Sequence, residues 1–598
     1  MLLGKHINKY YVKYAIFFII GIVALILVDV AQLYEPQFLG NMVDLLSDGV
    51  VSEDDKIKII RIIVYTLSLA GVMMLGRVLW RLTIFHGSFK IEAELRKEMF
   101  TKAEKLSQRY YHANKVGGVM AWFTNDIETI QEYTGWGTIM LVDACFLAVL
   151  VIVQMFILEP ILSLIAIVPI LLIVVWGALV EKFMSMKWEA RQQSFDNLYD
   201  FSQETFTGIR VIKAFVKETQ QLHAYAKLAR KDKDVNVDFA RVSVLFDVII
   251  EIIIAIIFAI IMGFGGWFVY SFVTGNPVVI FGHEVKLGAG QLVTFTGYFD
   301  LLIWPMIAMG QIVSMHSRAK TSLKRISKFL DEEEEIHDKE NAIDLKEVRG
   351  GIVFKDFSFQ YPEGSSPYLK HISLEIKEGE TIGIVGRIGS GKTTLANSLL
   401  RLYNVNEGQV FIDGNDLMDC SIKSIRDNIA YVPQDNFLFS DTVEHNIGFS
   451  NKNLPSEKIV EAAKFSDVHK DIKDFKVGYK TITGERGVAL SGGQKQRISI
   501  ARAYVKDAPI MILDDSVSAV DVKTEEMILK NISNLRKGKT TLVVASRVST
   551  VSHLDRIIVL DNGELEAFGT HKELLNTSPT YKKMVYLQEL EKEVEGGN

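Results

Sequence analysis

One stretch decides the fold of the second half of this chain: Gly386-Arg387-Ile388-Gly389-Ser390-Gly391-Lys392-Thr393. It fits the pattern G-x-x-x-x-G-K-[ST], and it joins an apolar run typical of a strand, residues 381–385, to a helical pattern at residues 393–400. In that setting the glycines let backbone N–H groups close around phosphate oxygens, and the start of the helix adds its positive dipole end. The stretch therefore predicts a phosphate-binding loop, or P-loop, within an α/β domain.

The side chains of this loop and of one later strand indicate a nucleoside triphosphate with Mg²⁺. Lys392 is placed to reach the β- and γ-phosphates, and the Thr393 hydroxyl is a predicted Mg²⁺ ligand. The apolar run 510–513 ends in Asp514, and a carboxylate at the end of a buried strand beside a P-loop also suits Mg²⁺. The candidate nucleotide-binding residues of the loop are Gly386, Gly389, Ser390, Gly391, Lys392, Thr393 and Thr394.

The sequence around the loop keeps one pattern from Gly350 to the end of the chain. Short β-rich runs alternate with helical segments, which is typical of α/β architecture. The expected strands are residues 352–359, 381–385, 410–412, 509–513, 541–544 and 557–560. We therefore predict an α/β P-loop ATPase domain over residues 350–598.

The first half of the chain differs, because long apolar runs replace the α/β pattern. Spanning a bilayer takes about 20 mostly apolar residues. Six segments qualify: residues 14–33, 59–84, 136–157, 161–180, 245–270 and 291–313. The sequence thus predicts a multi-domain protein. An all-α transmembrane domain with six helices occupies residues 1–330, and a charged linker, residues 331–349, leads to the ATPase domain.

Basic residues set the expected orientation in the cell membrane. Lys and Arg are frequent in two long polar stretches, residues 90–132 and 181–240, and three lysines precede the first span. Positive residues favour the cytoplasmic side, whereas the loop at residues 47–55 is acidic and falls outside. We expect a multi-pass membrane protein whose two termini, long loops and ATPase domain are all cytoplasmic.

Charge, cysteine content and the first apolar run exclude other classes. The formal net charge of −6 gives no reason to expect nucleic acid as a partner. Cys145 and Cys420 lie far apart in unlike contexts, so neither a disulfide framework nor a cysteine metal site is expected. The first apolar run is too long for the core of a cleavable signal peptide, so we expect a retained membrane helix.

A second motif, Leu490-Ser491-Gly492-Gly493-Gln494, opens the helical pattern at residues 496–504. A serine followed by two glycines at the start of a helix again forms a phosphate-binding geometry. The motif resembles the signature of ATP-binding-cassette (ABC) transporters, and essentially the whole chain resembles ABC exporters built as half-transporters. This resemblance implies ATP and Mg²⁺ as ligands, membrane lipids as surroundings and a second half-transporter as partner. In the family each ATP lies between the P-loop of one ATPase domain and the signature of the other, and one of each is present here.

The resemblance gives roles to further residues. Tyr361, in Phe-Gln-Tyr-Pro, resembles the aromatic residue that stacks on adenine. Gln434, in Tyr-Val-Pro-Gln, resembles the glutamine that contacts Mg²⁺ and signals to the membrane domain, and Asp521 resembles the D-loop aspartate. Residues 111–118 and 204–215 resemble the two cytoplasmic coupling regions, and the second of these reaches the partner's ATPase domain in the family.

Two positions depart from the family pattern. Directly after the strand-end aspartate the family has a glutamate that acts as general base toward the attacking water, and here this position holds Asp515. Where the family has a histidine that contacts the γ-phosphate, this chain has Ser546. A displacement of about 1 Å at a catalytic group can cost on the order of a hundredfold in rate, and serine cannot become cationic. We therefore expect a degenerate, slow ATP site in a heterodimer whose other chain keeps the glutamate and histidine; a homodimer of low activity is the alternative.

Ionisable residues inside the predicted spans bear on the cargo, because such residues are functional candidates by default. An acidic excess in the membrane favours cationic amphiphiles, although the same residues also form helix–helix salt bridges. We expect ATP-driven export of small amphiphilic, drug-like compounds. Lipid or peptide translocation, a mainly ATP-binding regulatory subunit, an ATP-gated channel and an importer with the exporter fold are the alternatives. The intramembrane candidates are Asp29, Asp143, Glu251 and Asp300.

Overall fold

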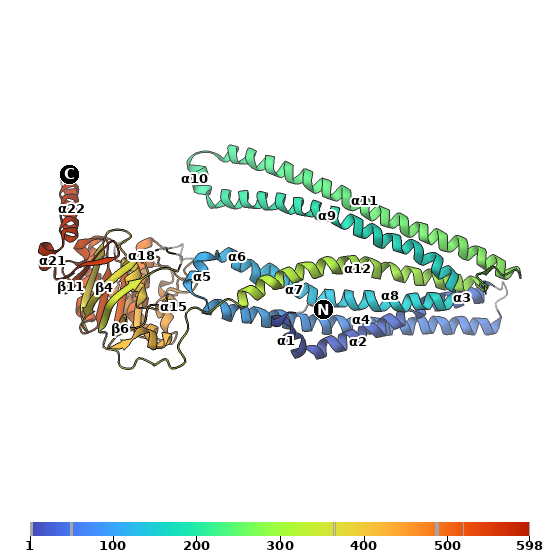
Figure 1. Cartoon of the computed structure of the whole chain (residues 1–598), viewed down its shortest axis with the longest axis horizontal. Helices are drawn as coiled ribbons and strands as arrows, with labels where there is room; N and C mark the ends of the chain where they lie inside the picture. The colour runs from blue at the N-terminus through green and yellow to red at the C-terminus, as the bar shows by residue number, and fades with distance from the viewer. Residues whose placement is uncertain are drawn as a thin grey trace. The chain divides into compact units, whose positions relative to one another are not determined.

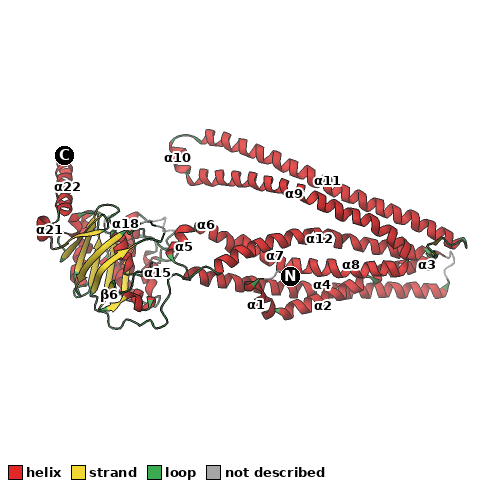
Figure 2. Ribbon diagram, viewed as in Figure 1, coloured by secondary structure: helices red, strands yellow, loops and turns green. Residues whose placement is uncertain are grey.

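The computed structural model describes residues 4–47, 52–362, 364, 366–484, 490–517 and 520–596, with only the backbone of residues 170–182 and 592–596. The chain divides into two compact units. Unit 1 comprises Met1–Lys102 and Val116–Glu332 and is mostly helical. Unit 2 comprises Ala103–Lys115 and Glu333–Asn598 and contains the two large sheets (Figure 1 and Figure 2). The expected fold class, a helical membrane domain followed by an α/β ATPase domain, is confirmed.

Long helices dominate unit 1. They are α1 (Lys5–Lys13), α2 (Ala15–Gln32), α3 (Tyr34–Ser47), α4 (Glu53–Lys105), α6 (Val116–Ala121), α7 (Ile127–Glu132), α8 (Thr138–Leu158), α9 (Pro160–Thr207), α10 (Ile209–Ala214), α11 (Glu218–Val273) and α12 (Ala289–Leu330). Single π-helical turns, Trp122–Asp126 and Tyr133–Gly137, flank α7. A small hairpin of β1 (Val279–Ile280) and β2 (His283–Glu284) joins α11 to α12.

All six predicted spans are helical in the structure. Among the described residues, the stretches long and apolar enough to cross a membrane are Ala15–Ser47, Glu53–Lys105, Val116–Leu158, Glu218–Val273 and Ala289–Leu330. The fourth predicted span, residues 161–180, begins with the apolar segment Pro160–Pro169 of α9 and then enters the range whose side chains are not described. Residues 48–51, in the predicted external loop, also lie outside the described residues.

Close backbone contact holds α3 against α12. A Cβ on Gly40 would lie 2.3 Å from the Gly290 carbonyl oxygen, and a Cβ on Gly290 would lie 2.2 Å from the Gly40 carbonyl oxygen. Asp44 of α3 accepts a hydrogen bond from the Gly290 N–H at 2.7 Å, where its carboxylate meets the positive end of the α12 dipole. Small residues therefore let these two membrane helices approach closely, as they do in other helical membrane proteins.

Two helices of unit 1 form an extended hairpin. α9 and α11 pack along each other, and the short helix α10 lies at the tip between them (Figure 1). Residues 204–215, which resemble the second coupling region, form this tip. The hairpin therefore carries that region to the end of a long helical arm.

The main sheet of unit 2 has the strand order β12-β11-β5-β10-β9-β8, and its neighbouring strands are parallel except for β11 and β12. The carboxyl ends of the parallel strands form one edge of the sheet, which is where ligands bind in open α/β sheets. The strands are β5 (Thr381–Gly386), β8 (Ile429–Val432), β9 (Ile510–Asp514), β10 (Thr540–Val544), β11 (Arg556–Asp561) and β12 (Glu564–Gly569).

A second, antiparallel sheet packs with the first around one apolar core. Its strands are β3 (Ile352–Phe359), β4 (Leu369–Ile376), β6 (Val410–Ile412) and β7 (Asn415–Asp416), in the order β4-β3-β6-β7. The helices of unit 2 include α5 (Gln108–Ala113), α13 (Lys392–Ser398), α15 (Val443–Ile447), α16 (Ser456–Phe465), α17 (His469–Asp474), α18 (Gly492–Val505), α19 (Val522–Leu535), α20 (Val548–Val551) and α22 (Pro579–Gly596). All six expected strands are present, whereas the helix expected at residues 393–400 ends at Ser398.

Candidate nucleotide site

The P-loop runs from the end of β5 to the start of α13 and needs glycine at two places. A Cβ on Gly386, at φ +156°, would lie 2.1 Å from the Leu560 carbonyl oxygen. A Cβ on Gly391, at φ +97°, would lie 2.3 Å from a methyl carbon of Leu369. Ser390 is buried, and its hydroxyl has no hydrogen-bond partner within the described residues. A buried unpaired hydroxyl at such a turn fits a phosphate oxygen of a bound nucleotide.

Lys392 lies folded over the loop. Its Nζ donates hydrogen bonds to the carbonyl oxygens of Gly386 at 2.9 Å and Arg387 at 3.0 Å. Burial lowers the pKa of Lys392, and the nearby charges of Asp515 and Asp514 act in the opposite direction. The ammonium group is therefore held at the loop by neutral acceptors, and a phosphate oxygen would form a stronger, charge-assisted bond with it.

The two predicted Mg²⁺ ligands, Thr393 and Asp514, lie together. Thr393 Oγ1 donates to Asp514 Oδ1 at 2.9 Å, and the Tyr431 hydroxyl donates to Asp514 Oδ2 at 3.3 Å. Asp514 is fully buried; burial raises the pKa of its carboxyl group, and the hydrogen bonds from Thr393 and Tyr431 partly offset that rise. A hydroxyl and a carboxylate beside a P-loop fit a Mg²⁺ ion that keeps several of its waters.

Gln434 and Tyr431 come from the same short stretch but lie differently. Gln434 follows β8 with an exposed side chain, at the sheet edge where Asp514 ends the neighbouring strand β9. Tyr431 pairs with Ile512 of β9, and this register brings its hydroxyl to the Asp514 carboxylate. Sequence reasoning singled out Gln434 and missed Tyr431. The signal available was its place in the same Tyr-Val-Pro-Gln stretch.

Asp515 and Ser546 lie opposite each other at the ends of β9 and β10. The Ser546 hydroxyl is 3.5 Å from Asp515 Oδ2, which is the outer limit of a hydrogen bond. The Asp515 backbone turns sharply at φ 44°, and its N–H donates to the Val544 carbonyl oxygen at 3.0 Å. The two departures from the family pattern therefore meet beside Asp514, the predicted Mg²⁺ ligand.

Tyr361 is held against the P-loop helix by its hydroxyl. The phenol oxygen is 2.8 Å from Thr394 Oγ1, and Thr394 is buried in the first turn of α13. In the same cluster the Tyr368 hydroxyl donates to the Gly389 carbonyl oxygen at 3.1 Å. Thr394 thus contacts the tyrosine through its hydroxyl, and its role in binding nucleotide stays a prediction. The rings that pack edge-on against Tyr361 are Phe359, Tyr368 and Tyr403.

The signature residues form the start of α18. Ser491 is the N-cap: its Oγ accepts from the Gln494 N–H at 3.2 Å, and Gln494 Oε1 accepts from the Ser491 N–H at 3.0 Å. Gly492 and Gly493 form the first turn, and an added Cβ on Gly492 would meet no atom within 4 Å. The N-terminus of α18 is therefore open, and its backbone N–H groups can receive a phosphate group from another molecule.

An ion pair between Asp471 of α17 and Arg497 of α18 anchors the signature helix. Gln494 Nε2 donates to Asp471 Oδ1 at 3.1 Å, and Arg497 donates to Asp471 Oδ2 at 2.9 Å. Arg497 also donates to the Asp467 carbonyl oxygen at 2.6 Å. Sequence reasoning missed Asp471 and Arg497, because the ion pair joins α17 to α18 and no local motif marks it. Together they fix the direction in which Ser491 faces.

Asp521 is the N-cap of α19. Its two carboxylate oxygens accept from the Thr524 N–H at 3.1 Å and from the Thr524 hydroxyl at 2.7 Å, and these bonds lower the pKa of Asp521. Residues 518–519, immediately before it, lie outside the described residues. Within this chain the carboxylate stabilises a helix start, and a role toward a partner stays a prediction.

Two family models cover most of the chain. Residues 18–306 match the model of the ABC transporter transmembrane region. Residues 369–518, in the α/β unit, match the model described as ABC transporter. A probable multidrug resistance ABC transporter ATP-binding/permease protein of Bacillus subtilis, YheI, is 34% identical over 596 residues, covering 100% of this chain and 98% of that protein. The chain belongs to the ABC transporter family.

Other similar proteins share the whole architecture of this ABC transporter. The multidrug resistance-like ATP-binding protein MdlA of Escherichia coli is 32% identical over 575 residues, covering 96% of this chain and 94% of that one. A solved structure of a bacterial Atm1-family ABC exporter with ATP bound is 25% identical, with a TM-score of 0.79 over 97% of this chain and 99% of that chain. This ABC transporter is accordingly a half-transporter of the exporter type, in which a membrane domain is fused to an ATP-hydrolysing domain.

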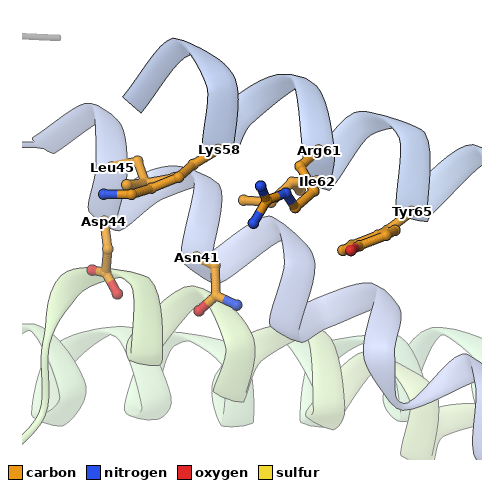
Figure 3. A pocket seen from close by; sticks show the side chains of 7 residues that line it. All are labelled: Asn41, Asp44, Leu45, Lys58, Arg61, Ile62 and Tyr65. Carbon is orange, nitrogen blue, oxygen red and sulfur yellow. The ribbon is translucent and has the colours of Figure 1, made fainter. Parts of the chain in front are cut away.

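The membrane unit of this ABC transporter also has a hollow of about 480 Å³ between α3 and the start of α4 (Figure 3). Lys58 and Arg61 extend from α4 toward it, and Asn41 and Asp44 lie on the α3 side. Lys58 also pairs with Asp55 at 3.0 Å, and Asp44 bonds the start of α12. These side chains join helix ends within unit 1, and none of them belongs to the nucleotide site.

Proposed function

We propose that this chain exports amphiphilic, drug-like compounds across the cell membrane as one half of a dimer, and that its own site binds Mg-ATP but hydrolyses it slowly. Relatives over its full length are described as multidrug resistance transporters, which supports the cargo class. The observation that carries the slow site is the pair Asp515 and Ser546, which faces an otherwise complete P-loop and Mg²⁺ pocket.

The residues of the site divide into binding and reacting groups. Lys392 and the P-loop N–H groups hold the phosphates, and Thr393 with Asp514 would hold Mg²⁺, which supplies positive charge at the phosphates when bound. Hydrolysis also needs a base that orients the attacking water and a donor at the γ-phosphate. Asp515 has the charge for the first task but is one methylene shorter than glutamate. Ser546 can donate one hydrogen bond but remains neutral.

The signature residues support the proposal that this chain works as one half of a dimer. Ser491–Gln494 cap an open helix end and rest on the Asp471–Arg497 pair. A second half-transporter that retains the glutamate and histidine would place its ATP against this end, and hydrolysis would take place there. We also propose a membrane domain over residues 1–330, a linker over 331–349 and a nucleotide-binding domain over 350–598, with both termini cytoplasmic.

ATPase measurements test the assignment. We expect the chain alone to hydrolyse ATP slowly and the assembly isolated with its partner to turn over at least about tenfold faster. Rapid turnover by the chain alone would contradict a degenerate site.

A restoring variant locates the defect. Asp515→Glu with Ser546→His should raise hydrolysis by about 10- to 100-fold, because the base regains its length and the γ-phosphate regains a cationic donor. The matched control adds Lys392→Ala, which should abolish the gain because phosphate binding at this site is lost. A gain that survives the control would come from another site, and no gain at all would place the defect elsewhere.

A further inference from the structure

Unit 1 encloses a second hollow, of about 260 Å³, between α2, α4, α8 and α12. It lies among helices predicted to span the membrane, away from the start of α4. Its α2 wall consists of two apolar residues and one glutamine, and the other three helices contribute charged and aromatic side chains. The lining residues are Leu25, Val28, Gln32, Arg77, Trp80, Asp143, Leu147, Asp300, Leu301 and Trp304.

Carboxyl groups gather at this hollow. Asp143 and Asp300 line it, and Asp143 Oδ2 accepts a hydrogen bond from the Trp304 indole N–H at 2.6 Å. Asp29 of α2 lies next to Asp143 and interacts with its carboxyl group. Asp29 is fully buried, and neither of its oxygens accepts a hydrogen bond within the described residues. A buried carboxyl group without partners is costly, so it marks a functional position inside a membrane domain.

Positive charge does not balance these groups. Among the described residues that line the hollow, Arg77 of α4 supplies the one cationic side chain. Arg81, one turn later, lies over the Trp80 ring at 5.2 Å and is not a lining residue. Three carboxyl groups, those of Asp29, Asp143 and Asp300, thus gather around one arginine. Arg77 can offset one of them, so the carboxyl groups outnumber their counterions.

A further group without a partner belongs to the lining residue Trp80. Trp80 is buried, and its indole N–H donates to no acceptor within the described residues. The residues that line the hollow therefore bring carboxyl groups together with two indole rings, those of Trp80 and Trp304.

We propose that this hollow binds the cationic head of the transported compound, namely a monovalent organic cation attached to an aromatic ring. Asp143 neutralises the charge, and Trp80 and Trp304 contact the cation and its ring through their π faces. A volume of about 260 Å³ holds such a head and leaves the rest of a larger amphiphile outside. The assignment rests on the export function proposed above, because it names the class of cargo.

Binding of a matched pair of probes tests the site. The full-length transporter, isolated as its own assembly and placed in lipid nanodiscs without nucleotide, is titrated with benzyltrimethylammonium and with its uncharged isostere neopentylbenzene. We expect wild type to bind the cation about tenfold or more tightly than the isostere. Asp143→Asn should remove that preference and leave isostere binding unchanged, which also shows that the variant is folded. Equal affinities in wild type, or an unchanged preference in Asp143→Asn, would overturn the proposal.

Two further variants sharpen the result. Glu251→Gln on α11 is the matched control, since Glu251 is exposed and does not line the hollow, and it should change neither affinity. Asp29→Asn should keep the cation preference, because Asp143 and the two indole rings that contact the cation remain. The probes bind without ATP, so this outcome is independent of the nucleotide site. Export of uncharged amphiphiles without cation binding would overturn the cation site and leave the export function standing. Cation binding without export would support the site and overturn the export function.

Discussion

At the residue scale, the Mg²⁺ site depends on a carboxylate in an unfavourable position. Asp514 is fully buried, and burial raises the pKa of its carboxyl group above the ordinary value. An acid whose pKa is higher in the folded state destabilises the fold once the pH exceeds that pKa, and this cost is absent below the pKa of the unfolded chain. At neutral pH without Mg²⁺ the cost is present, and a Mg²⁺ ion bound at Asp514 would offset it.

Asp514→Asn should therefore stabilise the protein and inactivate its site. The uncharged amide removes the cost of a buried charge, so we expect the apparent Tm without Mg-ATP to rise by about 2 °C. The further rise that Mg-ATP causes in wild type should disappear. Thermal unfolding with and without Mg-ATP measures both effects. The exposed Asp435→Asn serves as control and should change neither, and a lower Tm for Asp514→Asn would contradict the argument.

Tyr431→Phe should make nucleotide binding more sensitive to acid. The Tyr431 hydroxyl donates to Asp514 at 3.3 Å and favours its ionised form. Without that donor the pKa of Asp514 rises further, so Mg²⁺-dependent ATP binding should be lost at a higher pH than in wild type. Binding of a fluorescent ATP analogue across a pH series measures the midpoint. An unchanged or lower midpoint would show that the hydrogen bond does not matter.

The sequence predicts this site in part. Thr393 and Asp514 were expected together because each lies at a fixed place in a motif, and strand pairing brings the two motifs to one sheet edge. The bond between Tyr361 and Thr394 was not expected, because it depends on how two separate strands orient an aromatic ring. A motif therefore predicts the residues on a loop better than it predicts their neighbours from other elements.

At the element scale, the same contrast appears among the strands. The buried strands β5, β9 and β10 are continuous apolar runs, as parallel strands covered on both faces are, and all were expected. Among the strands of unit 2, the short strands β7 and β8 were not expected, and neither were the longer strands β4 and β12. Strand β4 alternates buried and more exposed residues, and β12 is partly exposed along most of its length. Each of these two strands lies at the edge of its sheet. Half-exposed edge strands resemble loops in composition, and that is why pattern alone does not mark them.

Asp471→Ala should impair the signature helix without affecting the P-loop of the same chain. The substitution removes the acceptor shared by Gln494 and Arg497, so the start of α18 loses its orientation. We expect ATP hydrolysis by the assembly to fall about tenfold, because in the proposed dimer the signature would act on the partner's nucleotide. ATP binding by the isolated chain should stay within about twofold. Asp474→Ala, exposed on the same helix α17, is the control and should leave hydrolysis unchanged. Equal losses of binding and hydrolysis would instead indicate general unfolding.

At the scale of the whole molecule, the proposed dimer predicts that a second chain completes both the nucleotide site and the surface of the membrane unit. The tip of the α9–α11 hairpin carries apolar side chains that are largely exposed: Phe206 is 72%, Phe215 70% and Val216 81% exposed. The hairpin tip lies beyond the apolar spans, in a region expected to be cytoplasmic. An exposed apolar group on a polar segment indicates a protein surface that covers it.

The hairpin tip should therefore transmit the nucleotide cycle between the two chains of the assembly. Phe215→Ser removes a large exposed ring, so we expect transport and substrate-stimulated ATP hydrolysis to fall by at least about tenfold. ATP binding should not change, since Phe215 and the P-loop belong to different units. Transport into vesicles and ATPase stimulation measure the effect. The neighbouring exposed Lys217→Ser is the control for loss of side-chain volume without loss of apolar surface, and it should behave as wild type. If Phe215→Ser transports normally, the tip is not a coupling contact, and the link between the ATPase domain and the membrane helices must run through the first cytoplasmic loop instead.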